Sequence, residues 1–152
     1  EMFVFEDGRQ RISKIDKSGN VTKVIGDGYG SLNGSKTETQ FGHINGMAFD
    51  SAGNLFVSDQ GKIRKITFAA GSGDASSEAF AGTGNWGYVE GAGTDAEFRE
   101  PGGIVVDASD NILVASVQVI APIDNSKRGL IISVIFENGK AIKMISANGE
   151  GR

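Results

Sequence analysis

Short runs in which apolar and polar residues alternate follow one another along most of the chain. Alternation of this kind is typical of strands that bury one face, and no segment shows the period of about 3.6 residues that a helix of useful length requires. The pattern therefore predicts an all-β protein. The expected strands are residues 1–7, 11–16, 21–25, 45–49, 55–58, 63–68, 78–81, 103–106, 112–120, 131–135 and 141–145.

The segments between these runs are rich in turn residues. Residues 26–40 and 82–97 are Gly-rich connectors, and residues 137–140 contain Asn-Gly, the strongest short-range hairpin signal in the chain. Two segments interrupt the order of strands. They are a polar insertion at residues 70–77 and an irregular stretch at residues 121–128.

One long stretch occurs twice, because adding 57 to each residue number maps residues 30–57 onto residues 87–114 without a gap. An internal repeat of this size predicts a repeat architecture, in which each unit buries its apolar face against a neighbour. The identical pairs are Gly30/Gly87, Gly34/Gly91, Thr37/Thr94, Phe41/Phe98, Gly46/Gly103, Asp50/Asp107, Asn54/Asn111 and Val57/Val114.

Each repeat unit contains four expected strands after its connector. Four-stranded antiparallel units that recur every few tens of residues are the sequence form of β-propeller blades. The expected division is an incomplete blade at residues 1–25, a blade at residues 26–81, a blade at residues 82–147 and the start of a further connector at residues 148–152.

The repeat units also carry a family resemblance. The runs INGMAFDSAGNLFVSDQGKIRKI and PGGIVVDASDNILVAS resemble NHL repeats, and the connectors that precede them resemble the long-linker variety of that family. The resemblance covers nearly the whole chain, although the last unit lacks a match to the Ile-Arg-Lys-Ile element after Val114. It implies propeller blades and an extracytoplasmic setting, secreted or in the cell envelope. It implies less about activity, because the family includes binding platforms, lyases and lactonase-like relatives.

The number of blades raises a question of closure. The chain holds between two and three units, whereas propellers close with roughly 4–8 blades. We therefore expect its outer blade faces to pack against further blades of the same protein or of neighbouring copies. Expressed alone, the chain is expected to be oligomeric or poorly soluble.

Composition narrows the range of functions. The 152 residues have a net charge of −4 and a pI of about 5.0, which argues against nucleic acid as a partner. The absence of cysteine removes disulfides, thiolate metal sites and a thiol nucleophile. No apolar run is long enough to predict membrane insertion.

Candidate polar chemistry is sparse. Asp50 and Asp107 could be metal ligands, but each opens a turn that ends in Asn, where the carboxylate accepts backbone N–H bonds; we predict that turn role. His43 is the only histidine and lies opposite Glu100 of the next repeat, at the expected mouth of the channel. It is either a ligand-binding residue or a surface or packing histidine. We expect no catalytic set, no metal site and no cofactor.

Aromatic residues divide into two groups. Phe41 and Phe98 are expected to fill the clefts between successive blades. Trp86, Tyr88 and Tyr29 lie in connectors that cross one propeller face, where they either bind a ligand by stacking or pin the connector to the blade. The only compact basic cluster, Lys62, Arg64 and Lys65, is expected to line a solvated strand edge.

These patterns favour a non-catalytic binding or scaffold module that recognises a protein, a peptide or a glycan through one propeller face. The alternative is a fragment of a propeller hydrolase or lyase, with a metal site that blades outside this chain complete.

Overall fold

The computed structural model describes residues 1–87, 89–119, 128–135 and 142–146. Nearly all of its regular structure is strand, and no helix in this part of the chain is of a length and apolarity to cross a membrane. Two short 3-10 helices, η1 (Asp7–Arg9) and η2 (Gly93–Asp95), lie in loops. The strands are β1 (Met2–Glu6), β2 (Arg11–Ile15), β3 (Val21–Ile25), β4 (Gly34–Ser35), β5 (Ile44–Phe49), β6 (Leu55–Asp59), β7 (Lys62–Phe68), β8 (Ala75–Ala81), β9 (Pro101–Val106), β10 (Ile112–Val119), β11 (Arg128–Ile135) and β12 (Ile142–Ser146).

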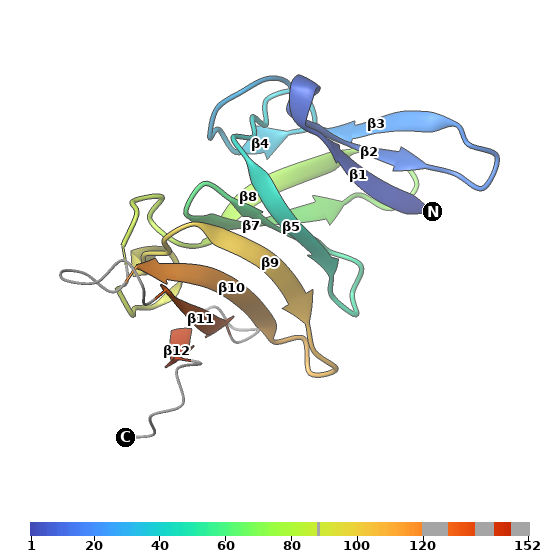
Figure 1. The fold of residues 1–152 in the computed structure, drawn as a ribbon. Helices are drawn as coiled ribbons and strands as arrows, with labels where there is room; N and C mark the ends of the chain where they lie inside the picture. Colours follow the sequence, from blue (N-terminus) through green and yellow to red (C-terminus); the bar gives the residue numbers. More distant parts are fainter. Residues whose placement is uncertain (88, 120–127, 136–141, 147–152) are drawn as a thin grey trace.

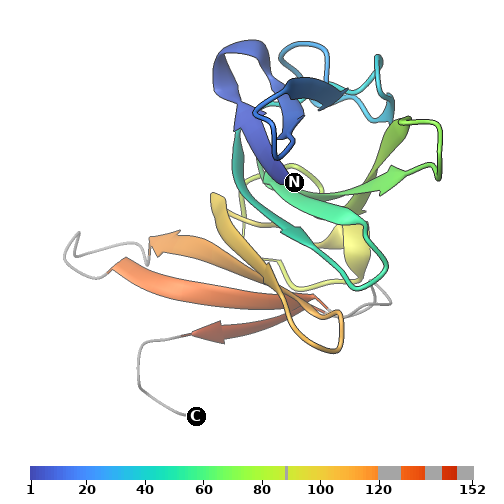
Figure 2. The ribbon, with the colours of Figure 1, turned by 90° about the vertical axis from the view of Figure 1, so that its right-hand side faces the viewer.

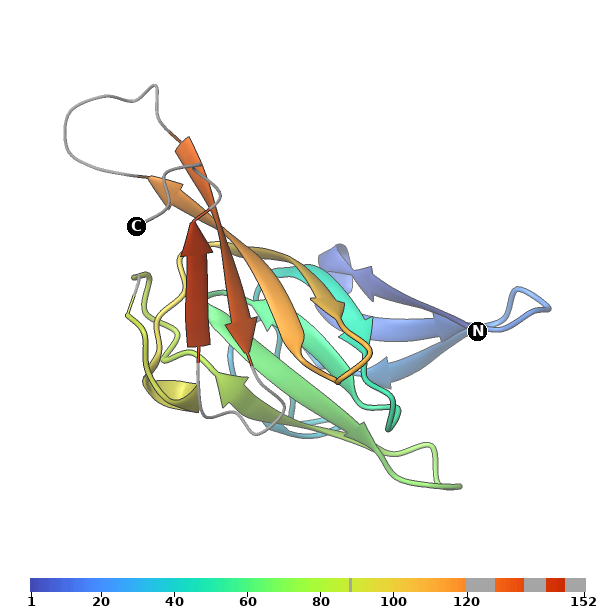
Figure 3. The same ribbon diagram turned by 90° about the horizontal axis from the view of Figure 1, so that it is seen from below.

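These strands form three antiparallel sheets that follow one another along the chain (Figures 1 and 2). The first sheet has the order β1-β2-β3, the second β4-β8-β7-β6-β5, and the third β12-β11-β10-β9. Strand β5 of the second sheet lies beside β9 of the third, as Figure 3 shows. The prediction of successive four-stranded antiparallel units is confirmed, with β4 added to the second sheet from its connector. We call each sheet a blade and β5 and β9 the inner strands.

The observed strand limits differ most from prediction at β8. This strand begins at Ala75, within the segment expected to be a polar insertion, and pairs with β7 from Phe68↔Ala75 onward. Ala75 and Ser77 are buried. Small side chains at these alternate positions form the inward face of β8, which the polar composition of the segment did not reveal. Only a short turn remains, closed by the Ala69 amide donating to the Asp74 carbonyl. The expected hairpin at residues 137–140 and the expected connector at residues 148–152 lie outside the described residues.

Phe41 and Phe98 fill equivalent places between successive blades, which confirms their predicted role. Phe41 is fully buried among residues of the first and second blades, including Ile25 and Val57. Phe98 is 2% exposed, in a cluster formed by the second and third blades. Each ring belongs to a connector, so the connectors contribute to the core between the blades. The cluster around Phe41 contains Ile12, Val24, Ile25, Phe41, Leu55, Val57, Ile66 and Ala75. The cluster around Phe98 contains Phe56, Ile63, Ala81, Ala96, Phe98, Ile104, Ile112 and Val114.

Asp50 and Asp107 occupy matching turns after the inner strands, as predicted. The Asp50 carboxylate accepts from the backbone N–H and the side-chain amide of Asn54, at 2.7 Å each. Asp107 accepts from the same two groups of Asn111, at 2.9 and 2.8 Å. Asp16 makes the same bonds to Asn20 in the first blade, a match that the repeat alignment did not include. These carboxylates are satisfied within their own turns.

The hydrogen bonds of these turns predict a loss of stability in acid. In Asp16 and Asp107, donation from the Asn side chain and then from backbone N–H groups lowers the pKa below the ordinary Asp value. A group with a lowered folded pKa contributes stability that is complete above the unfolded value of about 3.9 and is lost as pH falls through the folded pKa. Urea unfolding between pH 7 and pH 2 should show this decline. Asp107→Ala should reduce its slope, and an unchanged slope would contradict the assignment.

Strand direction separates the loops into two faces. The turns opened by Asp16, Asp50 and Asp107 lie together at one end of the blades, which we call the turn face. Loop 7–10, the β6–β7 turn and connectors 26–43 and 82–100 lie at the other end, which we call the connector face. In Figure 1 the turns are at the right and the connectors toward the left. The connector face carries the candidate site.

Candidate functional site

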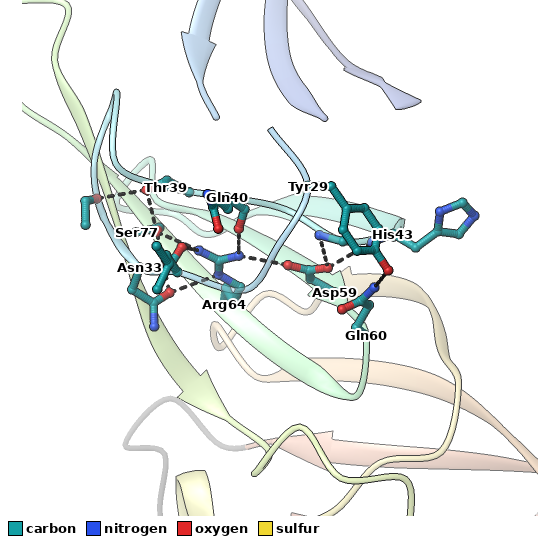
Figure 4. Close-up of polar contacts among 12 residues, drawn as sticks. Tyr29, Asn33, Thr39, Gln40, His43, Asp59, Gln60, Arg64 and Ser77 are labelled. Atoms are coloured by element: carbon teal, nitrogen blue, oxygen red, sulfur yellow. Dashed lines mark hydrogen bonds and ion pairs between the residues drawn. The ribbon is translucent and has the colours of Figure 1, made fainter. Parts of the chain in front are cut away.

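Arg64, on β7, is the residue that attaches the first connector to the second blade (Figure 4). Its side chain is fully buried, so the expectation of a solvated basic edge was wrong for this residue. The guanidinium donates to the Asp59 carboxylate at 2.8 Å and lies 4.7 Å from the centre of the Phe41 ring. It also donates to the connector carbonyls of Leu32 and Gln40, at 2.6 and 2.5 Å. Further bonds go to the side chains of Asn33 and Ser77.

This burial has an electrostatic consequence. Desolvation lowers the pKa of the Arg64 guanidinium from its ordinary value, while the hydrogen bond and the charge of Asp59 act to raise it. The ordinary value lies so far above neutrality that the side chain stays charged. An ion pair at this depth is maintained because both partners have further hydrogen bonds. Arg64 and Asp59 are therefore a structural pair that orders the connector.

Asp59 also fixes the backbone immediately before the inner strand β5. Its Oδ1 accepts from the backbone N–H groups of Gly42 and His43, at 3.0 Å each. The chain is thereby held where it enters β5, with the His43 side chain outside on the connector face (Figure 4). The His43 Nδ1 atom lies 3.2 Å from a carboxylate oxygen of Asp7, and both side chains are largely exposed.

Tyr29 is held by a separate contact from the same turn. The Gln60 amide donates to the Tyr29 hydroxyl at 2.7 Å, and the Gln60 side chain lies directly over Gly42. A Cβ at Gly42 would come within 2.0 Å of that side chain, so a larger residue there would displace the Gln60 amide from its position. Tyr29 nevertheless remains 68% exposed. Its ring is positioned without being buried, which is the state expected of a binding surface.

A pocket of about 320 Å³ lies at this place, between the second and third blades. Its volume is at the lower end of the usual range for small-ligand sites. Three of the four candidate residues from the sequence, Tyr29, His43 and Trp86, line it, while Tyr88 lies outside the described residues. The complete described lining is Tyr29, His43, Asn45, Gln60, Gly61, Trp86, Glu100 and Pro101.

The lining follows the internal repeat. An offset of 57 maps Tyr29 onto Trp86 and His43 onto Glu100, so each blade contributes one connector aromatic and one residue before its inner strand. Trp86 is 62% exposed, close to the value for Tyr29. Equivalent positions of two successive blades therefore line the pocket, and both blades are needed to form it.

Two lining residues have an unusual backbone conformation. Gln60 and Glu100 have φ angles of 46° and 48°, in the left-handed region that non-glycine residues rarely occupy. Such strain persists where surrounding structure imposes it, and it occurs often at ligand sites. Sequence reasoning placed Glu100 opposite His43 but missed Gln60.

Metal-binding groups do not converge in the described part of the chain. Among residues 1–87, 89–119, 128–135 and 142–146, no three His, Asp or Glu side chains are placed to hold one ion. The polar side chains that line the pocket carry one imidazole, one carboxylate, two amides, a phenol hydroxyl and an indole N–H. This set suits hydrogen bonding and stacking.

A larger hollow of about 570 Å³ lies on the turn face, between the first and second blades. Phe3, Phe49 and Phe68 line it, with Phe3 and Phe49 packed edge to face at 4.9 Å between ring centres. Residues of all three strands of the first blade line the hollow, together with Phe49, Phe68 and the β7–β8 turn of the second blade, so it lies between these two blades.

Comparison with solved structures defines the class of protein. A luciferin-regenerating enzyme matches 90% of this chain with a TM-score of 0.57 and 12% identity, over 36% of its own length. A Bacteroides thetaiotaomicron protein of unknown function matches 95% of the chain with a TM-score of 0.58 and 20% identity, over 32% of its own length. The chain folds as blades of a β-propeller. It spans about a third of each of these two structures, and identities this low show the fold alone. No protein-family model matches the sequence, nor does any curated protein.

Proposed function

We propose that the chain belongs to a non-catalytic binding platform of the NHL-repeat propeller type, which recognises a peptide, a protein or a glycan through its connector face. One observation carries the proposal. Two exposed aromatic side chains from equivalent positions of successive connectors, Tyr29 and Trp86, line one pocket. Large rigid aromatics that stay accessible beside hydrogen-bonding groups are typical of recognition sites.

The ordering of the site supports binding as well. Gln60 fixes the Tyr29 hydroxyl, and Asp59 fixes the backbone at His43. Fixing these groups before a ligand arrives reduces the entropy that binding must overcome. The polar groups of the pocket are suited to hold a ligand and do not form a nucleophile with an adjacent base.

The rival function is that of a propeller hydrolase or lyase whose metal site needs further blades. Its test is metal analysis of the purified protein by mass spectrometry. Calcium or zinc bound in stoichiometric amounts, together with loss of activity on chelation, would favour the enzyme and contradict the platform.

The platform can be tested with the fluorescence of Trp86, the only tryptophan in the sequence. Binding in the pocket should quench or shift its emission when peptides or oligosaccharides are titrated. Tyr29→Ala keeps this signal and should weaken binding about three- to tenfold, the scale of one aromatic contact. Tyr29→Phe should retain most of the affinity.

The matched control is Leu32→Ala, which changes an exposed apolar residue of the same connector outside the pocket. Its affinity should equal that of the unchanged chain. If no peptide or oligosaccharide alters Trp86 emission, or if Leu32→Ala and Tyr29→Ala behave alike, the pocket is not the recognition site.

We also propose that the outer faces of the first and third blades pack against other blades, either of the same protein or of neighbouring copies. The 152-residue chain alone should then self-associate, because an uncovered blade face exposes apolar surface. Sedimentation velocity at several concentrations should show species larger than the monomer. A monomer that unfolds cooperatively at every concentration would contradict this.

A further inference from the structure

We infer that the pocket between the second and third blades takes a cationic group, the guanidinium or ammonium of a basic peptide side chain. The inference rests on the proposed binding function and specifies its ligand. It follows from the charge, the hydrogen-bonding capacity and the aromatic faces of the lining.

Charge is the first argument. Glu100 contributes a carboxylate to the pocket, and no Lys or Arg is present among the described lining residues. Lys62, whose side chain lies against Gly84 of the second connector, is not part of the lining. Asp7, beside His43, adds a second carboxylate on the same face. An anionic ligand would meet unfavourable charge here, whereas a cation would meet favourable charge.

Hydrogen-bonding capacity points the same way. The Asn45 side-chain amide donates one of its two N–H groups to the Pro101 carbonyl at 3.1 Å, and its side-chain oxygen can accept from a ligand. Glu100 is an acceptor through both carboxylate oxygens when ionised. Glu100 and Asn45 thus offer acceptors to a ligand, and a guanidinium or ammonium is a donor with no acceptor capacity. The two are complementary.

The aromatic faces supply the third argument. A cation over the face of Trp or Tyr is attracted by the ring quadrupole, and Trp is the strongest of these partners. The pocket provides both Trp86 and Tyr29, each more than half exposed. The chain already makes this contact internally, where the Arg64 guanidinium lies 4.7 Å from the Phe41 ring centre. A neutral sugar would stack on the same rings but would gain nothing from the charge of Glu100.

The test uses capped pentapeptides, Gly-Gly-Arg-Gly-Gly and its citrulline counterpart, and the neutral disaccharide maltose, with Trp86 emission as the readout. Citrulline has nearly the shape of arginine but no charge. The arginine peptide should bind about tenfold more tightly than the citrulline peptide, the scale of one desolvated cation–π contact. Raising the salt concentration should weaken its binding.

Two variants complete the test. Glu100→Gln removes the pocket charge and should weaken arginine-peptide binding about three- to tenfold, as loss of a charged hydrogen bond does. Glu78→Gln removes an equal charge from the exposed face of β8, away from the pocket, and should change affinity less than about twofold. Circular dichroism checks that both variants are folded.

The outcomes separate the two proposals. Equal binding of arginine, citrulline and maltose, unaffected by Glu100→Gln, would overturn the cationic ligand while leaving the binding platform intact. Tight binding of maltose alone would assign the pocket to glycans. If none of the three probes nor any broader peptide or oligosaccharide set changes Trp86 emission, both the ligand and the platform are wrong.

Discussion

Replacing Arg64 with Met should lower the free energy of unfolding by about 3–5 kcal/mol, the scale of breaking a buried ion pair by removing one partner. The Asp59 carboxylate would remain buried without its counter-charge, the Gln40 carbonyl would lose the guanidinium donor, and the Leu32 carbonyl would keep only the Gln40 N–H. The Asp59 side chain has little access to water, so its desolvation would no longer be offset. Chemical denaturation of the purified variant measures the loss.

A second substitution tests the physical reason. In the Arg64→Met background, Asp59→Asn removes the uncompensated charge and should recover part of the lost stability, a positive coupling visible in a double-mutant cycle. Lys65→Met, on the same strand but partly exposed, is the matched control and should stay within about 0.5 kcal/mol. A loss for Arg64→Met no larger than this control would show that the pair is not structural.

Replacing Phe98 with Ala should destabilise the chain by about 3–5 kcal/mol, because the ring fills the cleft between the second and third blades. The effect should exceed a simple transfer energy, since two blades cannot collapse into the vacated space without changing their relative position. Thermal and urea unfolding both measure it. Phe98→Leu, which leaves a smaller void, should have a smaller effect.

Its control lies on the neighbouring strand. Val105 of β9 is largely exposed, in contrast to the buried Ile104 beside it. Val105→Ala should change stability by no more than about 0.5 kcal/mol. If Phe98→Ala is as mild as Val105→Ala, the connectors do not contribute to the core between blades.

The repeat made most of the fold predictable, since period-two alternation and the 57-residue offset anticipated the blades, the Asp turns and the Phe pair. Arg64 was mispredicted because strand alternation was treated as if one face met water. Arg64 shares its face of β7 with the buried Ile66, and the first connector covers that face, whereas Lys65 on the opposite face is partly exposed. The signal was present in Asp59, which precedes the β6–β7 turn and is within reach of Arg64.

The candidate site was predictable in its residues and not in its geometry. Applying the same offset of 57 to Tyr29 and His43 leads directly to Trp86 and Glu100, so the pairing of pocket residues was present in the sequence. The role of Gln60 was not, because it depends on a left-handed backbone and on a long-range bond to the Tyr29 hydroxyl. Such contacts follow from how loops cross and not from any local pattern.

The separation of the two faces has a practical consequence for how the molecule can be handled. The Asp16 and Asp50 carboxylates on the turn face accept hydrogen bonds from groups of their own turns, at the end of the blades opposite the pocket. The chain contains no cysteine, so one introduced at the exposed Ala52 would be a unique point for chemical coupling. A sensor surface prepared through that thiol would hold every molecule in one orientation, with the connector face turned toward the solution.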